Sequence, residues 1–334
     1  MGDFGYIGTK PTQLVGDNAG ILNIKDIAEL SADESTIKQG DFIPVTYYIS
    51  AGGGGGAGGG MVHGVGYHTG GMGGGGGLIT ATNSTSFKLG TNYAITIGGG
   101  GAGSSAASAG YGNGASRGTN GSDTTCVYEG GTFTAVGGGG GGGFSNWYDT
   151  HSGGNGGSGG GGGPSANLTG TGGTATAGQG NAGGNGVADA AHSKGGGGGG
   201  YSAAGQLGNA STPGTFTHRW DGGEARFAGG TGFPDYGGIF IEEHTVLGTN
   251  GMMTNSTGMP TSEVGHVNTS IGGGGGHQSS KAGGAGGKGF VLFIYSKALS
   301  MTVGGSLAST TTTVGNNKRT IVTDGTDNVS WAIA

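Results

Sequence analysis

Residues 137–143 read Gly-Gly-Gly-Gly-Gly-Gly-Gly, and such a stretch decides the fold because it offers no side chain from which to build an apolar core. Glycine makes up 94 of the 334 residues, about four times its usual share. Because glycine loses more backbone entropy on folding than any other residue, the chain must either stay disordered or use a fold that needs the missing side chain. Further pure glycine runs occupy 52–56, 73–77, 98–101, 159–163, 195–200 and 272–276.

The rest of the composition argues against disorder and against several classes of protein. Charged residues make up 10%, the net charge is −6, and the chain has 11 Phe, 11 Tyr and 3 Trp, which is not the composition of a solvated coil. Only 6 prolines and no strict Gly-X-Y repeat exclude collagen. Nucleic acid is not expected as a partner because no basic excess is present.

Targeting and cysteine signals are sparse. No signal peptide and no apolar run long enough to insert into a membrane are recognised, so we expect a soluble protein made in a cytoplasm. The single cysteine, Cys126, excludes an internal disulfide and is expected to be a small buried residue.

Polyglycine II helices give the glycine runs an ordered structure. This geometry has three residues per turn, rises about 3.1 Å per residue and makes no internal hydrogen bonds. Neighbouring chains can then satisfy one another's backbone groups, and the missing Cβ lets them pack closely, so hydrogen-bonded backbone takes the place of an apolar core.

The period of the runs predicts which helices are central. The all-glycine run 137–143 is expected to be enclosed. The stretches 153–160 and 283–289 carry their substituents three residues apart, Asn155 and Ser158 in the first and Ala285 and Lys288 in the second, so both are expected to be edge helices.

Ordinary secondary structure is expected outside the runs. Residues 23–30 favour a short helix with Asn23 as its N-cap, and β-prone stretches are found at 42–49, 93–97, 132–136, 290–295, 319–323 and 328–333. The residues between the last two, Asp324 to Asp327, are expected to form a hairpin turn.

The expected fold class is irregular or all-β-like: a bundle or sandwich of polyglycine II helices with loops and short strands. The sequence also predicts three regions. Residues 1–50 are expected to form a small α+β segment for docking or oligomerisation. Residues 51–296 form the glycine-rich domain with its loops, and residues 297–334 a β-hairpin-like tail.

The glycine runs joined by aromatic loops resemble the receptor-binding adhesin at the tip of the long tail fibres of T-even-like bacteriophages. Residues 5–11, Gly-Tyr-Ile-Gly-Thr-Lys-Pro, and 18–22, Asn-Ala-Gly-Ile-Leu, resemble the start of tail-fibre-like proteins of tailed phages. The resemblance implies a virion protein whose loops bind a host surface glycan or outer-membrane protein, and whose N-terminal segment binds other fibre proteins. A homotrimer remains open.

Large side chains in the loops are the candidate receptor contacts, because rings give contact area at low entropy cost. Covering the sides of the glycine helices is an equally good explanation for these rings. The candidates are Tyr67, His68, Trp147, Tyr148, Trp220, Phe233, Tyr236, Met252 and Met253.

Catalysis, cofactors and metals are not expected. The eight histidines show no tight cluster of the kind that metal binding needs, and sequence spacing does not establish the carboxylate pair of a glycosidase. We therefore expect a fibre protein that binds its receptor reversibly. Two alternatives remain: a structural fibre component without a receptor, and an ice-binding protein, since the snow-flea antifreeze type is also built from glycine-rich polyproline II helices.

Overall fold

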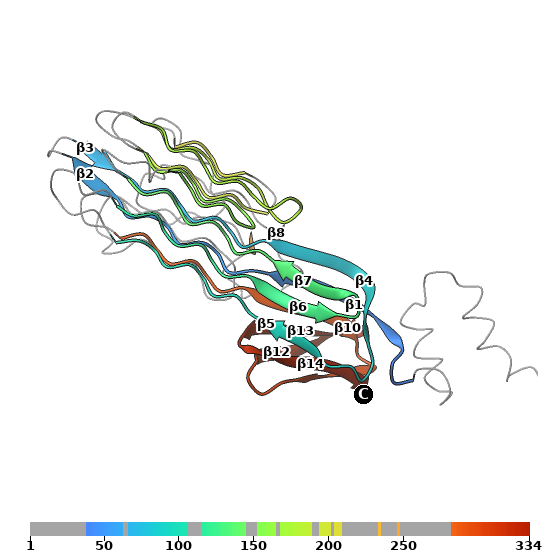
Figure 1. Ribbon diagram of the computed structural model, residues 1–334. Coiled ribbons are helices and arrows are strands. Elements are labelled where there is room, and N and C mark those ends of the chain that lie inside the picture. Colours follow the sequence, from blue (N-terminus) through green and yellow to red (C-terminus); the bar gives the residue numbers. More distant parts are fainter. Residues whose placement is uncertain are drawn as a thin grey trace, which may run out of the picture.

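The computed structural model describes residues 38–62, 66–105, 115–144, 152–164, 168–188, 194–201, 204–208, 233–234, 246–247 and 282–334. These residues contain strands and extended glycine segments but no α-helix. Figure 1 shows two sheets at one end of the molecule and glycine segments that run side by side away from them. The helix expected at 23–30 lies outside the described residues.

Two antiparallel five-stranded sheets form the strand-rich end. The first has the order β12-β13-β10-β1-β4 and the second has the order β11-β14-β5-β6-β7. The strands of the first are β1 (Phe42–Ser50), β4 (Leu78–Lys88), β10 (Phe290–Ser296), β12 (Ala308–Val314) and β13 (Asn317–Asp324). Those of the second are β5 (Tyr93–Thr96), β6 (Thr124–Tyr128), β7 (Gly131–Ala135), β11 (Leu299–Val303) and β14 (Thr326–Ile333). The six β-prone stretches are thereby confirmed as strands.

The two sheets enclose an apolar core that the glycine pattern did not predict. Trp331 of β14 is 1% exposed, and its ring centroid lies 4.9 Å from that of Phe87 in β4 and 5.2 Å from that of Phe293 in β10. Cys126 is fully buried in the same cluster, as expected. The core therefore combines side chains from both sheets, and glycine is not the only interior of this chain.

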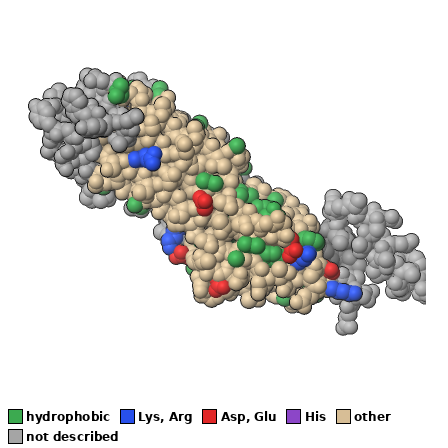
Figure 2. All heavy atoms as spheres, in the orientation of Figure 1, with side chains coloured by type: hydrophobic (Ala, Val, Ile, Leu, Met, Phe, Trp, Pro, Cys, Tyr) green, Lys and Arg blue, Asp and Glu red, His purple; other side chains and the backbone are tan. Residues whose placement is uncertain are grey.

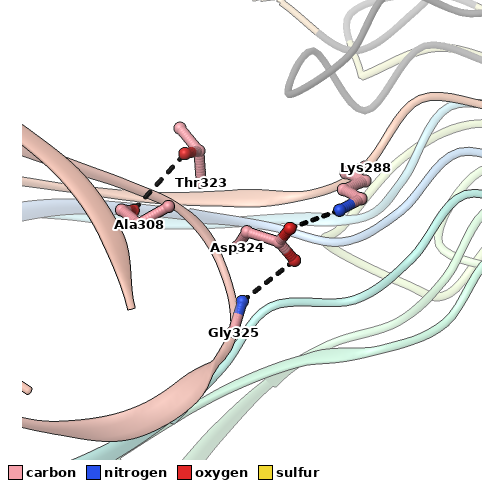
Figure 3. Close-up of polar contacts among 5 residues, drawn as sticks. All are labelled: Lys288, Ala308, Thr323, Asp324 and Gly325. Atoms are coloured by element: carbon pink, nitrogen blue, oxygen red, sulfur yellow. Dashed lines mark hydrogen bonds and ion pairs between the residues drawn. The ribbon is translucent and has the colours of Figure 1, made fainter. Parts of the chain in front are cut away.

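The expected hairpin at 324–327 is wrong, because β13 and β14 lie in different sheets. The turn is a corner between the sheets, where Gly325 has a φ of +96° and donates its N–H to Asp324. Asp324 also pairs with Lys288 of the glycine segment that leads into β10, so one carboxylate joins the corner to that segment (Figure 3). The tight hairpin of this region lies instead between β12 and β13, at Gly315 and Asn316.

The glycine segments are held together by backbone hydrogen bonds whose partner repeats every third residue. Segment 51–57 shows the pattern most fully, because three successive N–H groups donate to three different segments and the fourth returns to the first. The acceptors lie in 71–77, 119–122 and 284–287, in that order. Its carbonyls also accept from segments 97–105 and 136–144, for example from Gly101 at 2.8 Å and from Gly141 at 2.9 Å. One segment thus contacts five others, whereas a strand in a sheet has two neighbours.

Glycine segments that continue strands of opposite sheets are hydrogen-bonded directly to each other. Facing sheets are normally about 10 Å apart because side chains fill the space between them. β1 and β5 belong to opposite sheets, yet Gly53 beyond β1 accepts a hydrogen bond from Gly101 beyond β5. Beyond the ends of these strands, packing of hydrogen-bonded backbone therefore replaces the apolar core.

The expected central run is buried throughout, from Gly137 to Gly143. The expectation for 153–160 is wrong in part: Asn155 is exposed, but Ser158 is fully buried. The chain reverses there, since Gly157 donates to Gly137 while Ser158 accepts from Gly139, and the stretch belongs to two segments. In 283–289, Ala285 and Lys288 are part-exposed, as a period-three edge predicts.

The region boundaries at residues 50 and 296 stay a prediction. Strand pairing nevertheless crosses both of them, because β10 pairs with β1 on one side and with β13 on the other. An N-terminal segment, the end of the glycine-rich region and the C-terminal residues therefore share one sheet.

Candidate functional site

The glycine segments give the molecule two different ends. Segments 51–59, 97–105 and 136–144 follow β1, β5 and β7 and run away from the sheets. Segments 69–77, 115–122 and 282–289 return to β4, β6 and β10, and further segments between 152 and 208 lie against them. The end reached by the outgoing segments, here called the far end, lies opposite the sheets (Figure 1).

A short hairpin stands at the far end. It consists of β2 (Gly60–Val62) and β3 (Gly66–His68), with Met61 opposite Tyr67. Side-chain hydroxyls fix both of its stems to neighbouring segments: Ser104 accepts the N–H of Gly58 at 2.8 Å, and Thr69 accepts that of Gly195 at 3.0 Å. The backbone of Tyr67 and His68 is therefore carried at the far end.

The other large connections also leave from the far end. Two of these connections, 106–114 and 209–281, have stems that lie side by side. Ser104, before the first, accepts the N–H of Gly283, after the second, at 2.8 Å. Gly208 donates to Asn185, close to the paired residues Val187 and Lys194 that flank 189–193. Connection 145–151 follows the outgoing segment 136–144. The stems of all these connections are thus held together by one hydrogen-bonded bundle.

Most of the expected receptor contacts belong to these connections. The structure gives backbone positions to Tyr67 and His68 in β3 and to Phe233 in β8 (Phe233–Pro234), which pairs with β9 (Val246–Leu247). It describes none of the nine candidate side chains, so it does not show any of them in contact with another. Those outside the described residues are Trp147, Tyr148, Trp220, Tyr236, Met252 and Met253.

The side of the bundle offers little charge. Figure 2 shows only scattered basic and acidic side chains along the visible face of the bundle. Asp123 directly precedes β6, where its side chain accepts the N–H of Gly137 at 2.8 Å. This carboxylate therefore takes part in the hydrogen bonding within the bundle. This face therefore does not favour binding of a charged ligand.

Metal and thiol chemistry have no candidate site in the part of the chain that the structure describes. No group of three His, Cys, Asp or Glu side chains converges there. Burial raises the pKa of Cys126 to about 12, so this thiol stays protonated and unreactive at neutral pH. Within the same residues, no helix has the length and hydrophobicity to span a membrane.

The sequence did not predict one set of structural residues. These are asparagines at the margin of the bundle whose side-chain oxygens accept backbone N–H groups in place of a backbone carbonyl. Asn120, Asn155 and Asn185 each accept a backbone N–H of a neighbouring segment at 2.9 Å. Each is followed directly by glycine, and that dipeptide within a glycine-rich stretch is a signal that could have identified them.

Comparison with known proteins gives a family. A family model described as a glycine-rich domain matches residues 35–296, which is most of the chain. No curated protein matches the sequence significantly.

Proposed function

This chain belongs to the glycine-rich domain family, and we propose that it is a receptor-binding protein of a bacteriophage tail fibre. In this proposal the glycine segments are polyglycine II helices that form a rigid platform. The connections at the far end carry the receptor contacts, and the mechanism is reversible binding to a surface glycan or an outer-membrane protein rather than catalysis.

The hydrogen-bond period supports polyglycine II helices. Three residues per turn return every third N–H to the same direction, and the donors of segment 51–57 change partner with that period. A β-strand would alternate between two directions instead.

The separation of two ends is the observation that carries the proposal. Every large connection between glycine segments leaves from the far end, whereas residue 38 and the C-terminal Ala334 both lie at the sheet end (Figure 1). Backbone bonds at the sheet end place them there: Gly40 donates to Leu89, Gly90 to Trp331 and Ala334 to Ala298. Residues 1–50 would then dock the protein to the fibre while the loops point outward.

Backbone bonding suits variable loops. Because the bundle is joined by N–H and C=O groups, a loop can change its side chains without removing the contacts that hold its stems. Aromatic residues such as Trp147 and Tyr148 would supply contact area at low entropy cost.

Binding of the labelled full chain to a panel of whole Gram-negative cells tests the proposal. We expect saturable binding to at least one strain, competed by unlabelled protein. The double variant Trp147→Ser/Tyr148→Ser and a deletion of 233–266 should weaken it. The sheet-end variant Thr310→Ser, on the exposed strand β12, should not.

Two results would count against the proposal. Loop variants that bind as well as the parent, with unchanged melting curves, would remove the loops from recognition. A chain that binds no strain would favour the structural fibre component without a receptor.

A further inference from the structure

Three Asn-Gly steps lie at the margin of the glycine bundle: Asn120-Gly121, Asn155-Gly156 and Asn185-Gly186. All three asparagines are exposed, and the glycines that follow them are buried or part-buried. The first two steps adjoin each other, since the side-chain amide of Asn120 donates to the backbone carbonyl of Asn155 at 2.8 Å.

The fold requires glycine at the second position of each step. A Cβ on Gly121 would overlap the carbonyl of Gly52, and one on Gly156 would overlap the amide nitrogen of Gly139. A Cβ on Gly186 would come within 2.9 Å of the carbonyl group of Gly163. An asparagine that caps a neighbouring segment is therefore forced into the dipeptide that deamidates most readily, because glycine gives the reaction no steric hindrance.

Deamidation of such a step needs two free groups. The backbone nitrogen after the asparagine attacks the side-chain amide carbon, the bond to the amide nitrogen breaks, and ammonia leaves. Water then opens the resulting succinimide to aspartate or isoaspartate. The reaction requires a glycine N–H without a hydrogen bond and an asparagine side chain turned toward its own backbone.

The bundle engages both groups at every step. The glycine nitrogens donate to carbonyls of neighbouring segments, Gly121 to Gly138 at 2.9 Å, Gly156 to Thr174 at 3.2 Å and Gly186 to Gly170 at 2.9 Å. The side-chain oxygens of Asn120, Asn155 and Asn185 accept the N–H groups of Gly140, Thr174 and Gly172 in neighbouring segments, each at 2.9 Å.

We propose that these three steps are deamidation sites which the folded bundle keeps closed and which react when its margin opens. Isoaspartate adds a backbone atom, so the three-residue register beyond it no longer matches the neighbouring segments. Opening followed by reaction is then irreversible. Asn155 reacts first, since the Gly156 bond is the longest of the three.

Peptide mass spectrometry of the full chain during incubation in mildly alkaline buffer tests this. In the native state the three sites should deamidate roughly tenfold or more slowly than in the same chain under denaturant, because reaction requires local opening. Equal rates in the two states would overturn the proposal.

Two matched proline variants test the hydrogen bond itself. Thr174→Pro removes the N–H that holds Asn155, while Thr171→Pro changes an N–H for which the described residues show no partner, one turn earlier in the segment. Thr174→Pro should accelerate deamidation at Asn155 severalfold and leave Asn185 unchanged, whereas Thr171→Pro should leave the rate at Asn155 unchanged. An unchanged rate at Asn155 would overturn the assignment.

If the Thr174→Pro variant fails to fold, a second measurement on the parent chain tests the proposal. Amide hydrogen exchange of the parent chain should find Gly121, Gly156 and Gly186 protected, with Gly156 the fastest of the three. Exchange of these amides at the rate of an unfolded peptide would overturn the proposal.

Discussion

Gly54 lies so close to Gly139 that a methyl group on Gly54 would overlap the Gly139 carbonyl. The two residues belong to segments that extend from opposite sheets, and at this depth backbone packs directly against backbone. Gly99, in the neighbouring outgoing segment, has open space where its Cβ would stand. Glycine is therefore required at some positions of a run and only permitted at others.

Gly54→Ala should destabilise the protein strongly. Since the atoms it would meet are backbone, the segments must move apart, and overpacking of this kind costs about 1–3 kcal/mol or more. Gly99→Ala is the matched control, which we expect to be neutral or stabilising by about 0.4–1 kcal/mol because alanine restricts the unfolded chain. Urea denaturation followed by circular dichroism measures both, and equal midpoints would contradict the packing described here.

Gln179→Ala should weaken the junction between sheet and bundle. The Gln179 side chain accepts the N–H of Val136 at 2.8 Å and donates to the carbonyl of Thr134 at 3.0 Å, so it bonds to the outer edge of β7 and to the start of the next segment. Its loss leaves a part-buried N–H unpaired, at about 1–2 kcal/mol. The exposed Gln206 is the control, and Gln206→Ala should change the free energy of unfolding by less than about 0.5 kcal/mol.

Strands were predictable from sequence where β-branched and aromatic residues are continuous, as in β1 and β10. The corner at Gly325 was not, because Asp-Gly between two strands is equally typical of a hairpin. β14 pairs instead with β11 and with β5, and β5 lies more than 200 residues earlier in the chain. Such long-range pairing leaves no local signal.

The candidate site was predictable only as a set of connections. Sequence identified the loops between glycine runs, but not that their stems meet at one end, since this depends on which runs go outward and which return. Ser158 shows the difficulty: its spacing from Asn155 matches an edge helix, yet a chain reversal buries it.

Acid should weaken the corner at Gly325 through Asp324. The hydrogen bond from Lys288 lowers the pKa of Asp324, so the folded state binds a proton less readily than the unfolded chain. A depressed carboxyl pKa stabilises the fold above the unfolded pKa, and this contribution disappears as the pH falls through the folded value. Because Asp324 is exposed, the effect is small.

Lys288→Met tests this linkage. Its free energy of unfolding should fall less than that of the parent between neutral and acidic pH, while the variant at the exposed Lys297, Lys297→Met, should follow the parent. Some acid sensitivity should persist in all three proteins, since Lys88 and Tyr93 lower the pKa of Glu129 in the same direction. Parallel pH profiles for Lys288→Met and the parent would show that the ion pair contributes nothing.

Trp331→Ala should be the most damaging substitution near the C-terminus. The ring is buried against Phe87 and Phe293 from the opposite sheet, and truncating such a side chain costs about 3–5 kcal/mol. Trp331→Phe should cost less, because a ring remains and the buried indole N–H, which has no partner among the described residues, is removed. Ile333→Ala, two residues later and 55% exposed, should fall within about 0.5 kcal/mol of the parent. If Trp331→Ala unfolded at the same urea concentration as Ile333→Ala, the last strand would be an appendage and not part of the core.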